Sequence, residues 1–300
     1  MSKIYVLGSL NMDLVINAPY MPVSGETLTG SGFMTAGGGK GANQAAAVGR
    51  LGGAVKMCGS VGADAFGEEL VASLSGAGVD VTHVQKVATS TGVAIIVIID
   101  CDNRIILDKG ANGTVTTAQV DAFLQDAQEG DIFLTQLESP YDVVEYALRK
   151  AKSMGMYTVL NPAPAKPEAV CMLDSVDMLT PNESETKIFA GEDDIECAIA
   201  KVRQLGVKDL IVTLGSQGCR YIGQGTDKKF PCFKVNAIDT TAAGDTFTGA
   251  VVTELSRGRT VEEAIPFASA ASAIAVTRKG AQTSIPSRTE VEQFLLAHNC

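Results

Sequence analysis

The sequence predicts an α/β fold in which a mostly parallel central sheet is flanked by helices and a small β-sheet lid projects from it. The chain has 300 residues, of which 46% are hydrophobic, which is enough to bury a substantial core. Short β-rich apolar runs alternate with segments of helical periodicity, as in parallel sheets with crossover helices. Two segments, residues 14–35 and 92–109, break this alternation. We expect one domain over residues 1–300, because no linker or repeat divides the chain.

The alternating elements follow one another along the chain. Strands are predicted at residues 3–9, 55–61, 131–136, 157–161, 177–181 and 209–215. Helices are predicted near residues 42–51, 66–77, 140–154, 194–205, 243–256, 261–278 and 288–296. Because parallel strands end at one edge of a sheet, the polar residues that follow them are candidates for a ligand site.

The two segments that break the alternation are predicted to form the lid. They contain the strand-like runs LVINAP, ETLTG, GVAIIVIID and NRIILDK. Turn residues such as DCDN separate these runs, in place of crossover helices. We therefore expect a small antiparallel sheet that projects from the main one.

Composition excludes several classes of function. The net charge of −10 argues against nucleic-acid or anionic-membrane partners. Seven cysteines, an odd number without a C-x-x-C pair, indicate a reduced chain in the cytoplasm. The apolar run at 93–99 is far shorter than the about 20 residues that span a bilayer. With only two histidines, proton transfer must rest mainly on carboxylates.

A glycine-rich stretch, TAGGGKGANQAAAVGRLGG, covers residues 35–53. Gly37 to Ala42 fit G-x-G-x-x-A, but the acidic residue expected about 20 positions later is missing. The stretch is not a Walker A loop, because Gly41 follows Lys40 where Ser or Thr is required. Two interpretations stay open. The glycines form a plain turn before an alanine-rich helix, or they admit a ligand to which Lys40 and Asn43 donate.

Polar residues follow two predicted strands. Asn11 and Asp13 lie just past the first strand, and their spacing of two points both side chains the same way in an extended chain. Together they can donate to and accept from vicinal hydroxyls, which suits a sugar. Glu138 follows the strand at 131–136. An Asx turn at Asn11 and charge complementarity to the next helix at Glu138 are the alternatives.

Two later turns follow the same pattern. Asn182 and Glu185 form a capping-box-like pair, and Glu185 could also hold Mg²⁺ through water. The glycine turn of TLGSQG, residues 213–218, could cradle nucleotide phosphates or be an ordinary β-turn.

The stretch DTTAAGDTFTGA opens a helix with small side chains. Residues 242–245 enter this helix, whose free N–H groups and dipole form an anion site. The Asp245 carboxylate could be an ordinary cap, or it could take a proton from an attacking hydroxyl. A carboxylate suits the second role because phosphoryl transfer passes through a loose transition state and the proton moves late.

The order of these motifs is more specific than any one of them. GSLNMD, GGGKGANQA, STGVA, QLES, NPAPA, TPNESE, TLGSQG, DTTAAGDTFTGA and AVTRKGAQTSIP together resemble the ribokinase branch of the carbohydrate kinase superfamily, from Lys3 to Phe294. The resemblance implies a ribokinase-like three-layer fold with a β-lid that often makes a homodimer. It also implies transfer of the ATP γ-phosphoryl group to O5 of D-ribose, with Mg²⁺ and K⁺ as cofactors.

The resemblance assigns roles residue by residue. It implies Asp245 as the catalytic base and an anion hole at Ala242, Ala243 and Gly244. The implied sugar contacts are Asn11, Asp13, Gly39, Lys40, Asn43 and Glu138. The implied nucleotide contacts are Asn182, Thr213, Leu214, Gly215, Ser216, Gln217, Gly218, Gly244 and Ser269. Glu185 matches a glutamate associated with Mg²⁺, and the implied monovalent-cation residues are Asp239, Thr241, Ala275, Arg278, Gly280 and Ser284.

The chain departs from the family pattern in few places. Ala242 stands where many members have glycine, and an alanine there is compatible with the helical φ expected at this position. The lid sequence diverges freely, which leaves the mode of dimerisation open. The alternative functions are a sister sugar or nucleoside kinase and a non-catalytic sugar-binding protein. A nicotinamide-dependent oxidoreductase is disfavoured by the missing acidic residue.

Overall fold

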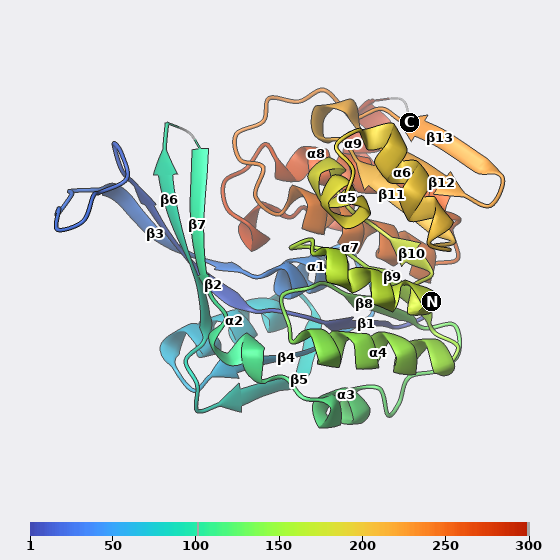
Figure 1. Cartoon of the computed structure of the whole chain (residues 1–300), viewed down its shortest axis with the longest axis horizontal. Coiled ribbons are helices and arrows are strands. Elements are labelled where there is room, and N and C mark those ends of the chain that lie inside the picture. Colours follow the sequence, from blue (N-terminus) through green and yellow to red (C-terminus); the bar gives the residue numbers. More distant parts are fainter. Residues whose placement is uncertain (101, 299–300) are drawn as a thin grey trace.

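The computed structural model describes residues 1–100 and 102–298 and confirms the predicted α/β class (Figure 1). Cys101 and Cys300, two of the seven cysteines, lie outside the described residues. A nine-stranded sheet has the order β13-β12-β11-β10-β9-β8-β1-β4-β5. Its strands are β1 (Ile4–Leu7), β4 (Val55–Gly62), β5 (Val79–Val87), β8 (Ile132–Thr135), β9 (Tyr157–Leu160), β10 (Met178–Leu179), β11 (Asp209–Thr213), β12 (Cys219–Gly223) and β13 (Thr226–Phe230).

The strands β5, β4, β1, β8, β9, β10 and β11 pair in parallel, as the alternation predicts. At the other edge, β12 pairs antiparallel with β11 and β13 pairs antiparallel with β12. The predicted elements do not include this edge hairpin. Its two strands follow β11 through short turns, without the crossover helix that a parallel strand needs.

Helices cover both faces of the large sheet. Ile4 and Val6 of β1 pack into one core cluster and Tyr5 and Leu7 into another, because successive strand side chains point to opposite faces. The first cluster is covered by α1 (Lys40–Arg50), α2 (Ala65–Gly76), α7 (Ala243–Ser256), α8 (Val261–Ala275) and α9 (Arg288–Ala297). The second is covered by α3 (Thr117–Phe123), α4 (Tyr141–Ser153), α5 (Glu183–Ala190) and α6 (Ile195–Gln204).

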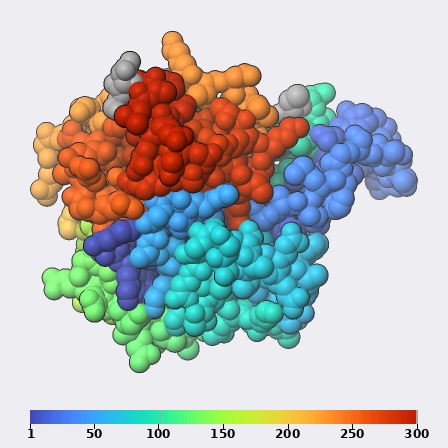
Figure 2. Space-filling model, turned by 180° about the vertical axis from the view of Figure 1, so that it is seen from behind, coloured from blue at the N-terminus to red at the C-terminus, as the bar shows by residue number. Residues whose placement is uncertain are grey.

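The lid is a separate four-stranded sheet of order β3-β2-β6-β7. Its strands are β2 (Asn11–Asn17), β3 (Ser31–Gly38), β6 (Gly92–Ile99) and β7 (Asp102–Asp108). It stands off the body as an arm (Figures 1 and 2). In the part of the chain that the structure describes, no helix is long and apolar enough to cross a membrane.

Two details of the predicted lid are wrong. The sheet is not purely antiparallel, because its two central strands, β2 and β6, pair in parallel. Between β3 and β6 the chain runs through α1, β4, α2 and β5, so it re-enters the lid without a hairpin that would reverse its direction. The run ETLTG, residues 26–30, is irregular, and the strand begins at Ser31.

Candidate active site

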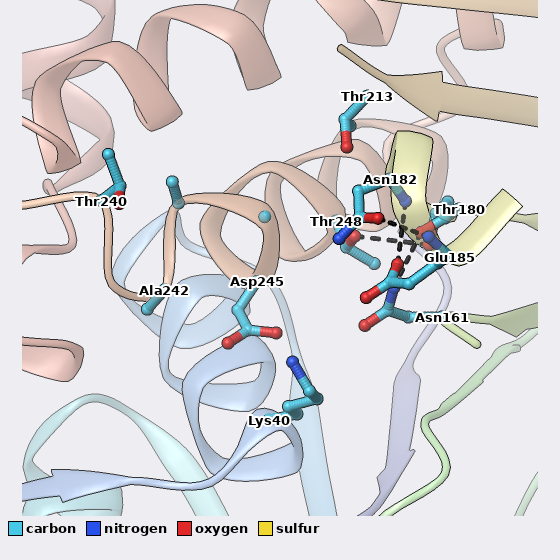
Figure 3. Close-up of a pocket in the computed structure, with 12 residues that line it drawn as sticks. Lys40, Asn161, Thr180, Asn182, Glu185, Thr213, Thr240, Ala242, Asp245 and Thr248 are labelled. Carbon is cyan, nitrogen blue, oxygen red and sulfur yellow. Dashed lines mark hydrogen bonds between the residues drawn. The ribbon is translucent and has the colours of Figure 1, made fainter. Parts of the chain in front are cut away.

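A pocket of about 190 Å³ lies at the carboxyl edge of the large sheet (Figure 3). It is lined by Lys40, Asn161, Thr180, Asn182, Glu185, Thr213, Thr240, Ala242, Ala243, Gly244, Asp245 and Thr248. The loops after β9 and β10 and the last residue of β11 contribute to it, together with the first turns of α1, α5 and α7. The sequence-predicted base, anion hole and Mg²⁺ residue thus meet in one cavity.

The first turn of α7 is built on an unusual backbone conformation. Ala242 is the N-cap residue and has φ +58°, in the left-handed region, so the expected helical φ is wrong. This conformation turns the chain into the helix, which explains why glycine is favourable at such a position. The Ala243 N–H donates to Thr240 O at 3.2 Å. Gly244 has open space around it, so the N-terminus of the helix stays accessible.

Asp245 lies in this first turn and is only 7% exposed. Its Oδ2 accepts from Asn43 Nδ2 at 2.9 Å and its Oδ1 from Gln44 Nε2 at 2.9 Å. Both amides come from α1, which packs against α7. The Lys40 side chain points toward the Asp245 carboxylate across the pocket (Figure 3). Two donors and a cation therefore surround this carboxylate.

The Lys40 ammonium has a perturbed pKa. Burial lowers the pKa, but the nearby carboxylates of Asp245, Glu138 and Glu185 outweigh burial and raise it. Lys40 is therefore charged at neutral pH. A fixed cation beside a helix N-terminus attracts a phosphate in spite of the negative charge of the whole chain.

The predicted sugar residues lie next to this pocket, at the base of the lid. Asn11 and Asp13 are part of β2, beyond the end of β1, and the alternation of the strand places them on one face as predicted. Burial raises the pKa of Asp13 to about 7, and the Glu138 and Asp245 carboxylates add to the rise. Gly38 of β3 lies opposite Asn11, and an added Cβ at Gly38 would come within 2.3 Å of Asp13 Oδ2. Close approach by backbone is therefore required here.

Asn112 fixes the orientation of the Asn11 amide. Its Nδ2 donates to Asn11 Oδ1 at 2.7 Å and to Leu10 O at 3.0 Å, and its Oδ1 accepts from Leu10 N at 2.8 Å. Because Asn11 Oδ1 is engaged, its Nδ2 donor is available to a ligand. Glu138 is held by the Ser9 hydroxyl, and its Oε2 also accepts from Lys40 N at 3.2 Å. Gly39 precedes α1 with φ +89°.

Asn182 and Glu185 form the predicted capping box at the start of α5. Glu185 N donates to Asn182 Oδ1 at 2.7 Å, and Asn182 N donates to Glu185 Oε2 at 2.8 Å. Burial raises the pKa of Glu185. The carboxylate still lines the pocket, so its structural role and a role in ion binding are compatible.

The predicted nucleotide turn lies beside the pocket. Thr213 lines the pocket. Gly215–Gln217 form a short 3-10 turn, which is closed by a hydrogen bond from Leu214 N to Gly218 O at 2.8 Å. Ser216 and Gln217 are exposed. Ser269 lies on α8, but the α8 side chain that reaches the start of α7 is Ser272, whose Oγ donates to Ala243 O at 3.0 Å.

The predicted cation loop is tied together by Asp239. Its Oδ1 accepts from Thr241 N and Oγ1 at 2.9 and 2.6 Å, and its Oδ2 accepts from Gly280 N at 2.9 Å. Burial raises the pKa of Asp239, but these hydrogen bonds outweigh burial and lower it. The Arg278 side chain pairs with Glu290 at 2.6 Å, so only its backbone carbonyl can serve a cation here. Ala275 O and Ser284 Oγ are engaged in local turns.

The comparisons with known proteins assign the family. The profile described as "pfkB family carbohydrate kinase" matches residues 1–288. The chain belongs to the pfkB family. This pfkB kinase is 43% identical to the ribokinase of Schizosaccharomyces pombe and 41% identical to that of Haemophilus influenzae, each over 97% of both chains. It is also 35% identical to the deoxyribokinase of Salmonella typhi, over 97% of this chain and 98% of that one.

Solved structures agree with this assignment. The ribokinase of Thermotoga maritima has a TM-score of 0.90 to this pfkB kinase at 38% identity, covering 99% and 100% of the two chains. The Arabidopsis thaliana ribokinase, complexed with ribose and ATP, has a TM-score of 0.90 at 33% identity and covers 98% of each chain. The predicted ribokinase-like fold is confirmed.

Sequence reasoning missed several polar residues of this pfkB kinase's pocket. Asn161, Thr180, Thr240 and Thr248 line it but were not among the predicted site residues. Gln44 contacts Asp245, although it lies within the alanine-rich part of the quoted motif. Asn161 and Thr180 directly follow β9 and β10, so the rule that placed Glu138 at a strand end could have found them.

Proposed function

We propose that this chain transfers the γ-phosphoryl group of ATP to O5 of D-ribose, giving D-ribose 5-phosphate. The observation that carries the proposal is the Asp245 carboxylate, held by two amides at the accessible N-terminus of α7 with the carboxylates of Asp13 and Glu138 nearby. A base, an anion site and sugar-binding groups are what this reaction needs.

The reaction follows from these positions. Ribose lies at the base of the lid, where Asn11 donates to a hydroxyl and the Asp13 and Glu138 carboxylates accept from others. The O5 oxygen attacks the γ-phosphorus, the O5–P bond forms and the bond to the bridging β,γ-oxygen breaks. The proton of the O5 hydroxyl passes to Asp245. The α7 N-terminus and Lys40 stabilise the charge on the transferred group.

Nucleotide and Mg²⁺ are assigned to the other side of the pocket. Asn182, Thr213 and the turn that follows Thr213 would hold ATP. No group of three His, Cys, Asp or Glu suited to direct metal ligation occurs among residues 1–100 and 102–298. A hydrated Mg²⁺ held through water by Glu185 fits this donor set. When bound, the ion would neutralise part of the phosphate charge.

The lid supports two further parts of the proposal. Closure of the lid over ribose would exclude water from the transfer. The lid also exposes large apolar side chains, among them Phe33 (65%), Ile105 (60%) and Ile106 (58%). An exposed apolar patch of this kind is typical of an interaction surface, so we assign it to a homodimer made through the lid.

A monovalent-cation site and a cytoplasmic location are the last two parts of the proposal. The carboxylate and carbonyl oxygens around Asp239 suit a hard monovalent cation, and we expect K⁺ to stimulate turnover. The cytoplasmic location stays a prediction from the cysteine content and the absence of paired spacing.

Coupled ATP turnover tests the function. D-ribose, 2-deoxyribose, fructose, adenosine and pseudouridine are each assayed with Mg²⁺, with and without K⁺. The proposal expects the highest kcat/KM with ribose, and stimulation by K⁺. A preference for 2-deoxyribose, the substrate class suggested by the name of the Salmonella relative, would contradict ribose as the substrate and leave the kinase reaction standing. Binding of ribose without turnover would favour a non-catalytic sugar-binding protein.

A further inference from the structure

A chain of buried amide side chains leads from the strand ends to the proposed base. Gln44 Nε2 donates both to Asp245 Oδ1 at 2.9 Å and to Asn161 Oδ1 at 3.1 Å. Gln44 Oε1 accepts from Gln136 Nε2 at 2.6 Å. Gln44 and Gln136 are 0% and 1% exposed. Gln136 directly follows β8 and is not among the residues that line the pocket, and it meets this part of the site through its hydrogen bond to Gln44.

The direction of each amide in this chain is fixed. Thr180 O is a backbone carbonyl and can only accept, so the Asn161 group that donates to it at 2.7 Å is the Nδ2 amide. Asn161 Oδ1 therefore faces Gln44, and the Gln44 group that donates to it is the Nε2 amide. Gln136 donates to the oxygen at the other side of the Gln44 amide and holds the same orientation.

We propose that Gln136 is a positioning residue for the phosphoryl transfer, acting on Asp245 through the orientation of the Gln44 amide. The inference rests on the proposed function, because it assigns Asp245 as the base. Two N–H donors, from Gln44 and Asn43, stabilise the ionised carboxylate and aim its free lone pairs at the sugar hydroxyl. Reversing the Gln44 amide replaces one donor with an oxygen that repels the carboxylate.

Other charged groups face Asp245 as well. Lys40 from α1, Asp13 from β2, Glu138 after β8 and Glu185 from α5 all act on this part of the site. None of them is replaced in a Gln136 variant. Because Gln136→Glu adds a carboxylate that itself acts on these groups, the comparison of the parent with the uncharged variant Gln136→Met reports on the amide chain.

The test is Gln136→Glu, which replaces the donor to Gln44 with an acceptor. The Gln44 NH₂ group then turns to the introduced carboxylate and its oxygen turns to Asp245. We expect kcat with ribose to fall roughly tenfold or more. The acid limb of the plot of kcat against pH should shift to higher pH by about one unit. KM for ribose should change less than about twofold, because no sugar contact is altered.

Two further variants keep the proposal falsifiable. Gln136→Met removes the donor without adding charge, and should shift the acid limb in the same direction with a smaller loss of kcat. Gln119→Glu is the matched control, because Gln119 is also a buried glutamine (7% exposed) but caps α3 away from the pocket, where Glu keeps the capping box. In this control, kcat and its dependence on pH should be the same as in the parent.

The outcomes separate the two proposals. A parent chain that is silent with every sugar contradicts the proposed function. An active parent whose kcat and acid limb are unchanged by Gln136→Glu and by Gln136→Met overturns the positioning role alone. A rise in KM for ribose with kcat unchanged would also overturn it, because it would place Gln136 in sugar binding.

Discussion

The two sheets of this kinase use similar residues under opposite conditions. In the large sheet, β1 is buried at all four positions and helices cover both faces. In the lid, β7 is exposed at all seven positions although it carries three apolar residues in succession, Ile105, Ile106 and Leu107. The large sheet is stabilised within the chain, whereas the apolar surface of the distal lid stays exposed.

The site lies where these two regions meet. Asp245 and its amide donors come from α7 and α1, which belong to the packed body. Asn11 and Asp13 come from the root of β2, where the lid begins and its strands are still buried. We infer that the body holds the chemistry rigidly and that the lid governs access. Three predictions test this division.

The largest effect is expected in the body. Asp245→Asn removes the proton acceptor while keeping the size of the side chain, so kcat should fall roughly 10²- to 10⁴-fold. Ribose binding, measured by calorimetry, should persist. The matched control is Asp121→Asn, because Asp121 is an exposed surface aspartate. Turnover near the parent value in Asp245→Asn would remove Asp245 from the base role.

A smaller effect is expected at the root of the lid. The pKa of Asp13 is raised to about 7 by burial and by the neighbouring carboxylates, above its unfolded value. Its stabilising contribution is therefore present below about pH 4 and lost as the pH rises through 7. Asp13→Asn should bind ribose weakly yet gain about 1–2 kcal/mol more stability, relative to the parent, at pH 8.5 than at pH 5.5.

Urea denaturation without ligand measures this gain at both pH values. Asp102→Asn serves as the control, because Asp102 is an exposed aspartate of the same lid. An equal gain at both pH values, or a loss at pH 8.5, would show that ionisation of Asp13 does not destabilise the fold.

The smallest effect on turnover is expected from the distal lid. Ile105 and Ile106 point to opposite faces of β7, so the double substitution Ile105→Lys/Ile106→Lys charges both faces. Light scattering should show a monomer, and KM for ribose should rise roughly fivefold, about 1 kcal/mol. Ile188→Lys, at an exposed position of α5 in the body, should leave the mass unchanged. A double variant that keeps the mass of the parent would place the dimer interface elsewhere or show that the parent is a monomer.

Local patterns predicted much of this molecule. Apolar runs located β1, β4, β8, β9, β10 and β11 of the large sheet, because the hydrophobicity of each run indicates its burial, whereas β5 was not among the predicted strands. The pair Asn182 and Glu185 predicted its capping box, since both partners lie within one helical turn. Ala242 shows the limit of such local reasoning, because its left-handed φ depends on how the preceding loop enters α7.

The sequence by itself determined the layered α/β class, the order of its motifs and the carboxylates that can act as bases. Only the tertiary structure decided that β2 and β6 pair in parallel and that Gln44 meets Asp245, 201 positions away in the chain. It also decided which end of each buried amide faces the base. Contacts of this kind leave no periodic trace, because they depend on the three-dimensional positions of partners rather than on local backbone preference.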